Sequence, residues 1–314
     1  MPDISQLLSA SHVAMANEGK RAEDQFSGSA LLTFLKKKGG VKVVPWGTTL
    51  QLTLDYRRNP GAEFIATDLS GTSLAKTEVL TTAEYSEGQI VVPITWTFAD
   101  EAKNPSMNQK VNLVTSLLEN ADTSHDDLIE EALFGSTTNG FIGLQTLLPD
   151  NGQGSPGGIN ATTDTWWRHY TANYFDDGSD IQSALGLAMS TAGKSSGGAQ
   201  PDLIVSGPTP YNLYEGSLQP LVRISEVETG KMGFKALKFR DADVIFSQYG
   251  DEDRFAGIRC KNTKLYMAKG FARKMGDEIE ITNQTAKTKK LYTMLQFATN
   301  NKSRSFVLTE TTAP

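Results

Sequence analysis

Residues 104–134 read NPSMNQKVNLVTSLLENADTSHDDLIEEALF, the longest stretch in the chain whose apolar side chains recur at helical spacing. Pro105 suits the first turn of a helix, and Gly135 suits the position just past its end. The apolar positions that trace one face are Val111, Val114, Leu117, Leu118, Ala121, Leu128, Ile129, Ala132 and Leu133. An unbroken helix over this stretch would be about 45 Å long at about 1.5 Å per residue. That length is unusual in a globular enzyme and is typical of a structural helix that supports a flat, extended layer.

The segment before this helix alternates between apolar and polar residues, as strands do. TTLQLTLDY ends at Tyr56, and QIVVPITWTF ends at Phe98. The Gly- and Pro-containing stretch between these two runs predicts one long hairpin over residues 41–98 that projects from the body. Pro93 interrupts the second run and cannot donate a ladder hydrogen bond, so this strand should be an edge strand or carry a bulge.

The rest of the chain predicts an α+β body with projecting elements. Residues 1–40 have two weak helical patterns, the second ending at Gly39, and too few apolar side chains for a core of their own. A helix is expected from about Asp180 to Ala192, with strand-like runs near 202–206, 241–246, 264–268 and 292–299. The sequence contains no internal repeat and no clear linker.

Composition excludes several classes of protein. The chain has 314 residues, a net charge of −6 and a pI near 5.2, which disfavours a dedicated nucleic-acid reader. No apolar run is long enough to span a membrane, and the N-terminus has no signal-peptide pattern. Cys260 is the single cysteine, so an intrachain disulfide is excluded and synthesis in the cytosol is expected.

AMSTAGKSSGG, residues 188–198, matches both a relaxed phosphate-binding loop and the G-x-S-x-G of a serine hydrolase. Both sites need a strand before the motif and a helix after it, whereas here a helix precedes Gly193. The histidine of such a hydrolase also follows its serine, and all three histidines of this chain precede Ser195. Gly193 is therefore predicted to cap the helix, with Lys194 near its negative end. A cytosolic hydrolase or NTPase that uses Lys194 or Ser195 stays a formal alternative.

No other constellation predicts chemistry. The histidines and Cys260 lack the spacing of a zinc site, and His125 is expected on the solvated side of the long helix. Polar turns explain the acidic clusters, whose members are Asp176, Asp177, Asp180, Asp251, Glu252 and Asp253. Trp166 and Trp167 favour buried packing or a subunit contact over a ligand platform. The sequence therefore predicts no enzyme, no cofactor and no metal.

The succession of segments resembles that of tailed-bacteriophage major capsid proteins with the Hong Kong 97-type fold. The segments that carry the resemblance are AEYSEGQIVVPITWTFADEAKN, NQKVNLVTSLLENADTSHDDLIEEALFG, GFIGLQTLLPD, GGINATTDTWWRHY, PDLIVSGPTPYNLYEGSLQPLVRIS, GFKALKFRDADVIF and LQFATNNKSRSFVLT. Their order and spacing cover most of residues 40–310. No single motif is diagnostic.

The resemblance implies a division of the chain. It implies an N-terminal arm at 1–40, an extended loop at 41–98, a peripheral domain with the spine helix 104–134, and an axial domain at 173–289. The peripheral domain would comprise 99–172 and 290–314.

The resemblance also implies a mechanical function. Copies of the chain would self-assemble through pentamers and hexamers into an icosahedral head shell that encloses double-stranded DNA without reading its sequence. The expected location is the virion capsid, after synthesis and assembly in the bacterial cytoplasm, with no membrane contact. Expected partners are a separate scaffolding protein, a portal and a decoration protein. Encapsulin nanocompartments share the fold and remain an alternative.

Residues at subunit contacts are predicted from charge and aromatic character. Arg57, Arg58 and Lys76 near the hairpin tip are expected to make inter-subunit ionic contacts. The aromatic residues expected at subunit contacts are Trp96, Trp166 and Trp167. Some relatives cross-link a loop lysine to an asparagine. No local pattern supports a pairing of Lys76 with Asn300 or Asn301, so no cross-link is expected.

Overall fold

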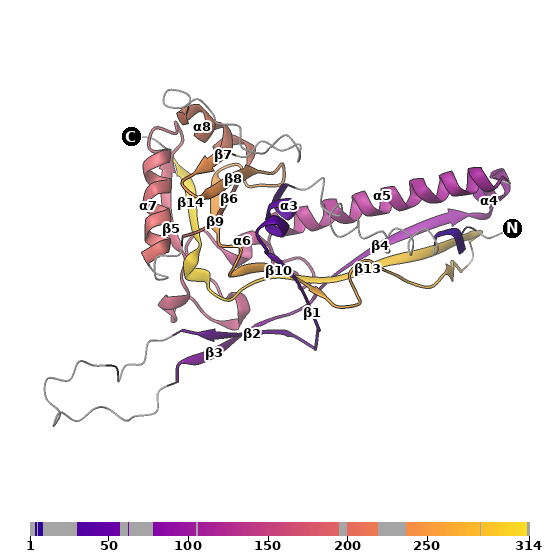
Figure 1. Cartoon of the computed structure of the whole chain (residues 1–314), viewed down its shortest axis with the longest axis horizontal. Helices are drawn as coiled ribbons and strands as arrows, with labels where there is room; N and C mark the ends of the chain where they lie inside the picture. Colours follow the sequence, from indigo (N-terminus) through magenta and orange to yellow (C-terminus); the bar gives the residue numbers. More distant parts are fainter. Residues whose placement is uncertain are drawn as a thin grey trace, which may run out of the picture.

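The computed structural model of the chain describes residues 4, 6–8, 30–56, 62, 78–104, 106–194, 200–218, 237–282 and 284–312. In these residues the fold has a long helix on an elongated six-stranded sheet, a second six-stranded sheet with helices beside it, and a two-stranded ribbon that projects from the body (Figure 1). The mixed architecture confirms the predicted α+β class.

Helix α5 (Met107–Phe134) confirms the long helix, and its 28 residues correspond to about 42 Å. It begins three residues later than predicted, because residues 98–103 form a separate short helix, α4 (Phe98–Lys103). Thr97 and Asp100 form a reciprocal capping box at the start of α4. Pro105 lies outside the described residues.

The predicted position of His125 on the solvated side of this helix is wrong. The buried stripe of α5 runs at steps of three and four residues, and His125 occupies one of its positions with 1% of its surface exposed. The other members of the stripe are Val114, Leu118, Ala121, Ile129 and Leu133. Val111 and Leu128, which the periodicity places on the core face, are 41% and 45% exposed.

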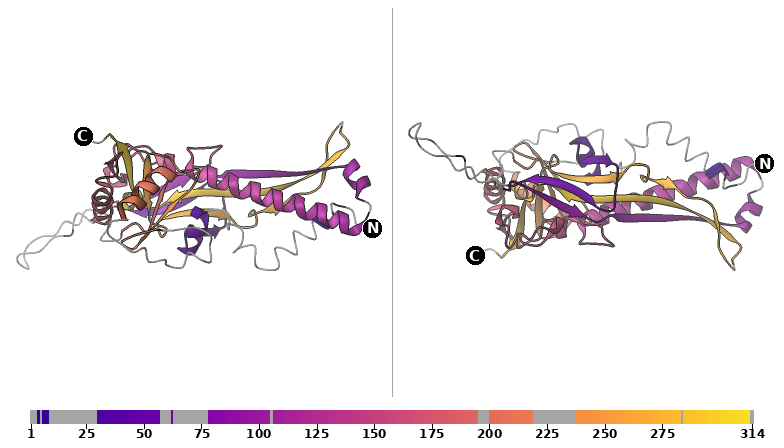
Figure 2. Two further views of the ribbon diagram at one scale, coloured as in Figure 1. Left: turned by 90° about the horizontal axis from the view of Figure 1, so that it is seen from above. Right: turned by 90° about the horizontal axis from the view of Figure 1, so that it is seen from below.

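The sheet under α5 is organised around β13 (Ala286–Thr299), a strand of 14 residues. Strand β4 (Gly88–Thr97) pairs antiparallel with β13 over ten positions, from Gly88 opposite Leu295 to Thr97 opposite Ala286. Both views of Figure 2 show α5, β4 and β13 running side by side along the long axis.

Four shorter strands complete this sheet. Strand β10 (Thr263–Ala268) pairs with the C-terminal part of β13, and β1 (Val41–Val44) adds in parallel to β10. Strands β11 (Lys274–Met275) and β12 (Ile279–Glu280) pair with the remainder of β13.

Strand β4 confirms the predicted alternation. Val92, Ile94 and Trp96 are buried in the cluster beneath α5, whereas Val91 and Pro93 are exposed. Among the described strands β4 pairs with β13 alone, so Pro93 lies in an edge strand as predicted.

The predicted single hairpin over 41–98 is wrong in its pairing. Strand β2 (Leu50–Asp55) pairs with β3 (Leu80–Tyr85), not with β4, which belongs to the sheet under α5. The ribbon β2–β3 keeps the predicted alternation, since Leu50 and Leu54 are buried. Its tip, with Arg57, Arg58 and Lys76, lies outside the described residues.

The second sheet has the strand order β5-β14-β9-β6-β8-β7. Its strands are β5 (Tyr170–Phe175), β14 (Phe306–Thr311), β9 (Arg254–Ile258), β6 (Leu203–Ser206), β8 (Ala242–Phe246) and β7 (Leu237–Phe239). Helices α7 (Ile181–Lys194) and α8 (Pro208–Leu218) pack on it and share a core cluster with it.

The chain crosses three times between the two six-stranded sheets, after β4, after β9 and after β13. Strand β14 pairs with β5 and β9, so residues 306–311 join the second sheet, whereas the resemblance assigns all of 290–314 to the peripheral domain. Strand β10, which the resemblance assigns to the axial domain, pairs in the sheet under α5. The proposed domain ranges remain a prediction. Strands β14 and β10 each pair in a sheet outside the domain to which the resemblance assigns them.

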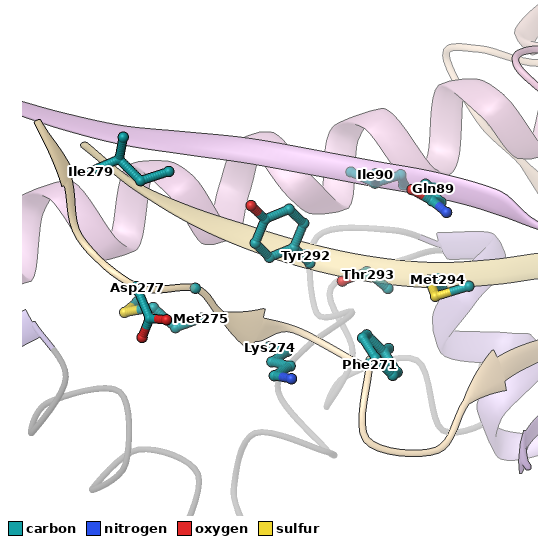
Figure 3. Close-up of a pocket in the computed structure, with 11 residues that line it drawn as sticks. Gln89, Ile90, Phe271, Lys274, Met275, Asp277, Ile279, Tyr292, Thr293 and Met294 are labelled. Atoms are coloured by element: carbon teal, nitrogen blue, oxygen red, sulfur yellow. The ribbon is translucent and has the colours of Figure 1, made fainter. Parts of the chain in front are cut away.

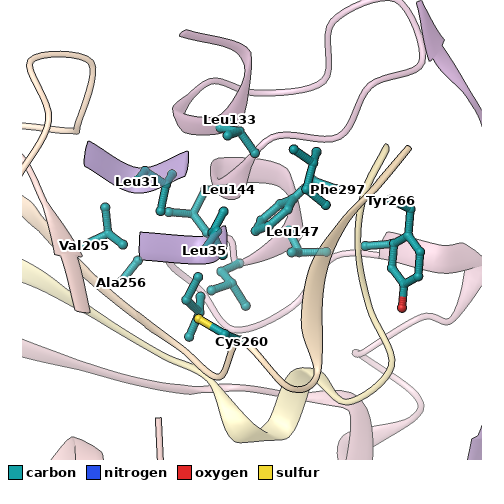
Figure 4. Packing of buried hydrophobic residues seen from close by; sticks show 14 of the residues in the cluster. Leu31, Leu35, Leu133, Leu144, Leu147, Val205, Ala256, Cys260, Tyr266 and Phe297 are labelled. Carbon is teal, nitrogen blue, oxygen red and sulfur yellow. The ribbon is translucent and has the colours of Figure 1, made fainter. Parts of the chain in front are cut away.

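One core cluster joins the two sheets. Helix α3 (Ala30–Lys37) inserts Leu31 and Leu35 between residues of both sheets, among them Val205 and Phe297 (Figure 4). The short helix α6 (Leu144–Leu147) closes the same cluster below the end of α5. Cys260 is buried here, and burial raises the pKa of its thiol far above the usual range, which keeps it unreactive.

The turn after α5 approaches the helix end so closely that only glycine fits at position 143. A Cβ on Gly143 would lie 2.1 Å from the carbonyl oxygen of Gly135 and 2.5 Å from that of Ala132. Both contacts are with backbone atoms of the helix end, so the turn itself would have to move.

We expect Gly143→Ala to destabilise the chain by about 1–3 kcal/mol, the usual cost of forced overpacking. Gly216→Ala is the matched control, because Gly216 lies in α8 and a Cβ added there would meet no atom within 4 Å. That control should be neutral or stabilising by up to about 1 kcal/mol. Urea unfolding of the purified variants measures both, and equal stabilities would contradict the packing argument.

Candidate assembly surfaces

In the stretch 188–198 the structure describes residues 188–194, which are the end of helix α7. The next described strand is β6, so a helix comes before the motif and a strand after it, the reverse of the order that a phosphate-binding loop or a nucleophile turn requires. The predicted cap at Gly193 is wrong, because α7 continues through Gly193 to Lys194. A Cβ at Gly193 would lie 3.0 Å from the side chain of Gln200. Ser195 lies outside the described residues.

The described part of the chain contains no group of three or more His, Cys, Asp or Glu side chains placed to hold a metal ion. No helix in the described ranges is long and apolar enough to cross a membrane.

A buried polar network fastens α5 to the sheet beneath it. Arg273 is 7% exposed, and its guanidinium donates to Asp122 at 3.0 Å and to Asp126, both on α5. Its backbone N–H donates to the Thr293 hydroxyl at 3.0 Å. His125 Nε2 lies 2.8 Å from the same hydroxyl. The network therefore connects α5 with β13 and with the segment that leads into β11.

Gln296 connects β13 with the turn after α5. Its side-chain oxygen accepts the backbone N–H of Ile142 at 2.9 Å, and its amide nitrogen donates to the carbonyl oxygens of Gly140, at 2.8 Å, and Ser86. Gln296 is fully buried, so these bonds satisfy its amide in place of water. A separate bond between the Ser247 hydroxyl and Glu130, at 2.6 Å, connects α5 with the second sheet.

Aromatic rings form the base of the ribbon. The rings of Tyr56 and Trp166 lie 4.8 Å apart, and those of Trp166 and Trp167 lie 5.5 Å apart. Beside them is a pocket of about 460 Å³, lined also by Arg168 and Arg304. The ribbon thus meets the body at a surface that is both aromatic and basic.

The aromatic residues predicted at subunit contacts differ in exposure. Trp96 is 2% exposed and donates its indole N–H to Glu101 at 3.0 Å, and Trp167 is 1% exposed and donates to the carbonyl of Pro156 at 3.2 Å. Both indoles are therefore occupied by their own chain and leave little surface for a neighbour. Trp166 is half-buried. The contact role of these residues, and of Arg57, Arg58 and Lys76, stays a prediction.

The outer face of the long sheet is an apolar surface that was not predicted from the sequence. On the side away from α5, a hollow of about 760 Å³ is lined by Phe271, Ile279, Tyr292 and Met294, among other residues (Figure 3). Phe271 is 42% exposed and Ile279 45% exposed. Nearby, Val91 on the edge strand β4 is 43% exposed. The alternation of β4 and β13 was the signal for this face, since every second residue of a sheet covered on one side points away from the cover.

A buried basic cluster supports the start of the second sheet. Burial and, to a smaller extent, the charges of Lys302 and Arg254 together lower the pKa of His169 from 6.5 to about 3. Lys302 is fully buried and donates to the carbonyl of Gln153 at 2.7 Å, and desolvation lowers its pKa to about 8. Arg254 donates to the carbonyl of Leu148 and pairs with Asp150 at 3.2 Å. His169 is therefore neutral in the folded chain at physiological pH.

Solved capsid structures share this architecture over almost the whole chain. The capsid asymmetric unit of cyanophage A-1(L) matches with a TM-score of 0.65 at 12% identity, over 92% of this chain and 94% of that one. The capsid of Myoviridae phage XM1 matches with a TM-score of 0.53 at 12% identity, over 89% and 92%. The holo-SrpI encapsulin of Synechococcus elongatus PCC 7942 matches with a TM-score of 0.51 at 9% identity, over 88% and 86%.

No protein-family model and no curated protein sequence matches the chain. At identities this low, the structural likeness shows the fold. The chain has the Hong Kong 97-type capsid fold, which confirms the fold expected from the succession of its segments.

We expect Arg273→Met to destabilise the chain by about 3 kcal/mol, because it leaves the carboxylates of Asp122 and Asp126 without their cation. Arg240→Met is the matched control, since Arg240 also has a positive φ (53°, against 50° for Arg273) but is exposed. Its loss should cost less than about 1 kcal/mol. Urea unfolding measures both changes, and equal costs would exclude a special role for the Arg273 network.

Acid should destabilise the fold through His169. The imidazole of the unfolded chain takes up a proton near pH 6.5, whereas the folded one resists it until about pH 3. Stability is therefore lost as the pH falls from 6.5 towards 3, by at most about 1.4 kcal/mol per pH unit. In His169→Leu this part of the slope should be absent. An unchanged slope in unfolding measured across this range would contradict the assignment.

Proposed function

We propose that this chain is the major capsid protein of a tailed bacteriophage, and that copies of it assemble into an icosahedral head shell around double-stranded DNA. The observation that carries the proposal is the match of fold over 92% of the chain to the cyanophage A-1(L) capsid subunit. A match of this extent includes the elongated sheet, the long helix and the second sheet together.

The surfaces of the chain support an assembled state. Strand β4 has ten residues and pairs on one side only among the described strands, and an open edge is a ready site for pairing with another chain. A ribbon of two strands is marginal by itself and needs packing partners. The exposed apolar side chains of the outer sheet face add a surface that a neighbouring copy would cover.

The shell role requires no catalysis. We infer a structural protein and not an enzyme, with pentamers and hexamers of the chain related by heterologous contacts. A separate scaffolding protein, a portal and a decoration protein are proposed partners. The virion capsid is the proposed location, with synthesis in the host cytoplasm.

A nanocompartment shell is the second candidate. The likeness to the Synechococcus elongatus encapsulin favours it, although the TM-score of 0.51 is lower than the 0.65 for the cyanophage capsid. The two roles differ in content, because a phage head holds nucleic acid and an encapsulin holds cargo protein.

The test is electron microscopy of the purified chain, alone and co-expressed with the genes adjacent to its own. We expect closed shells or tubes of uniform diameter. Nuclease-protected DNA in them supports the phage role, whereas a co-purifying cargo enzyme supports the nanocompartment. Lys194→Ala/Ser195→Ala serves as a control and should assemble normally. Monomers in every preparation would contradict the proposal, and loss of a measurable turnover in this control would favour the hydrolase or NTPase alternative.

A further inference from the structure

The strands β5, β14 and β9 separate charge along their length. Strands β5 and β14 run parallel, and β9 runs antiparallel to β14. The segments that enter β5 and β14 therefore lie at the same end as the segment that leaves β9. This end carries Arg168, Arg304 and Arg259, whereas the opposite end carries Asp253 and Glu310.

The basic end has two neighbouring guanidiniums, those of Arg259 and Arg304, at the same end of the paired strands β9 and β14. Desolvation lowers the pKa of Arg304, and the positive charge of Arg259 lowers it further. The Nε of Arg304 is buried and has no hydrogen-bond acceptor among the described residues. Neither arginine makes an ion pair within the described ranges. Two like charges held together in this way favour an anion supplied from outside the chain.

The pocket at the basic end can receive such an anion. It has a volume of about 460 Å³ and is lined by Arg168, Arg304, Asn301 and Trp166, with Asp55 as its one carboxylate. Arg168 is held in place by the carbonyl oxygens of Ala161, at 2.7 Å, and Thr162, at 3.1 Å. Guanidinium groups bind carboxylates through paired, charge-assisted hydrogen bonds.

The acidic end has an excess of negative charge, which complements the positive charge of the basic end. A second pocket, of about 580 Å³, is lined by Asp150, Asp251, Glu252, Asp253 and Glu310. Arg254 pairs with Asp150 at 3.2 Å and with Asp251 at 3.5 Å. Glu252 and Asp253 are exposed and make no ion pair with any described residue. Burial raises the pKa of Tyr174, and the charges of Glu310 and Asp253 raise it further, which shows the excess of negative charge there.

The two ends cannot neutralise each other within one chain. Strand β14 has six residues, which separates its ends by about 20 Å at about 3.3 Å per residue. Two different, complementary surfaces at opposite ends of a subunit produce a heterologous contact, and such contacts generate a closed ring when the rotation between successive copies closes.

We propose that the basic end, with Arg168, Arg259 and Arg304, binds the acidic end of a second copy of this chain through Glu252, Asp253 and Glu310. The inference rests on the proposed shell function and specifies one of its contacts. This contact arranges neighbouring copies head to tail around a ring. The basic end of each copy contacts the acidic end of one neighbour, and its acidic end contacts the basic end of the other neighbour.

The test is a charge swap with assembly as the readout. Arg259→Glu/Arg304→Glu places acid against acid, and Glu252→Lys/Asp253→Lys places base against base. We expect each to raise the critical protein concentration for assembly about tenfold or more. The chain with all four changes restores opposite charges at the contact and should recover most of the assembly. Because Arg304 is half-buried, Arg259→Gln/Arg304→Gln is included, and circular dichroism checks that every variant is folded.

The matched control for Arg259→Glu/Arg304→Glu is Lys103→Glu/Lys269→Glu, which alters two exposed cations elsewhere and lowers the net charge by the same amount. It should assemble as the unaltered chain does. Folded swap variants that assemble normally would overturn the contact while leaving the shell function intact. The contact would also be overturned if the chain with all four changes assembled no more readily than the two swap variants. Normal assembly with reduced DNA retention in Arg259→Glu/Arg304→Glu would overturn it in favour of phosphate binding. If the unaltered chain forms no shell, the proposed function itself fails.

Discussion

The structure depends on one constraint, which is that both faces of β13 need cover along all its 14 residues. Helix α5 covers one face through Val114, Leu118 and the other members of its buried stripe. Neighbouring strands satisfy the backbone on either side of β13, with β4 along one edge and β10, β11 and β12 sharing the rest. The other face of the sheet has no second helix over it among the described elements, and there the hollow with Phe271 and Tyr292 lies open.

A one-sided layer of this kind is costly for an isolated chain. Apolar surface left in water forfeits about 25 cal/mol for each Å² that a partner could bury. An open strand edge leaves donors and acceptors that only water or another strand can satisfy. In a symmetric assembly each weak contact recurs in every copy. Contacts of about 1 kcal/mol or less are therefore numerous enough to stabilise the assembly together. The elongated shape that is unfavourable for a monomer thus suits a shell subunit.

The sequence predicts the elements of this fold better than their pairing. The spacing of apolar residues predicts α5 to within three residues at its start, and the alternation in QIVVPITWTF predicts which face of β4 is buried. Strand β3 has no such signal, because the two aliphatic residues of LTTAEY, Leu80 and Ala83, lie on opposite faces of the strand. Because β3 is not recognisable in the sequence, the alternating run of β4 is predicted as the pairing partner of β2.

Residues of the candidate assembly surfaces could be predicted only where their charge or burial follows from the spacing of residue types along the chain. His125 counts as polar in any periodicity, so the sequence could not show that Thr293 and Asp126 bond to it in the buried stripe. Arg259 and Arg304 are 45 residues apart in the chain, and only the antiparallel pairing of β9 and β14 brings them together. Trp166 was identifiable as an aromatic contact, but its partner Tyr56 belongs to a ribbon whose pairing the sequence does not reveal.

The buried polar groups add what apolar packing cannot supply, namely direction. Leu31 and Phe297 would tolerate a small rotation of one sheet against the other, because the hydrophobic effect is proportional to area and has no preferred angle. The bonds of Ser247 to Glu130 and of Gln145 to Asp251 connect α5 and α6 with the second sheet, so they are lost on such a rotation. A buried polar group without its partner costs about 1–3 kcal/mol, so a few such bonds fix the angle between the sheets. In a closed shell that angle sets curvature, and curvature has to be the same in every copy for the shell to close. In the proposed shell, the polar junctions would thus link the fold of one chain to the geometry of the assembly.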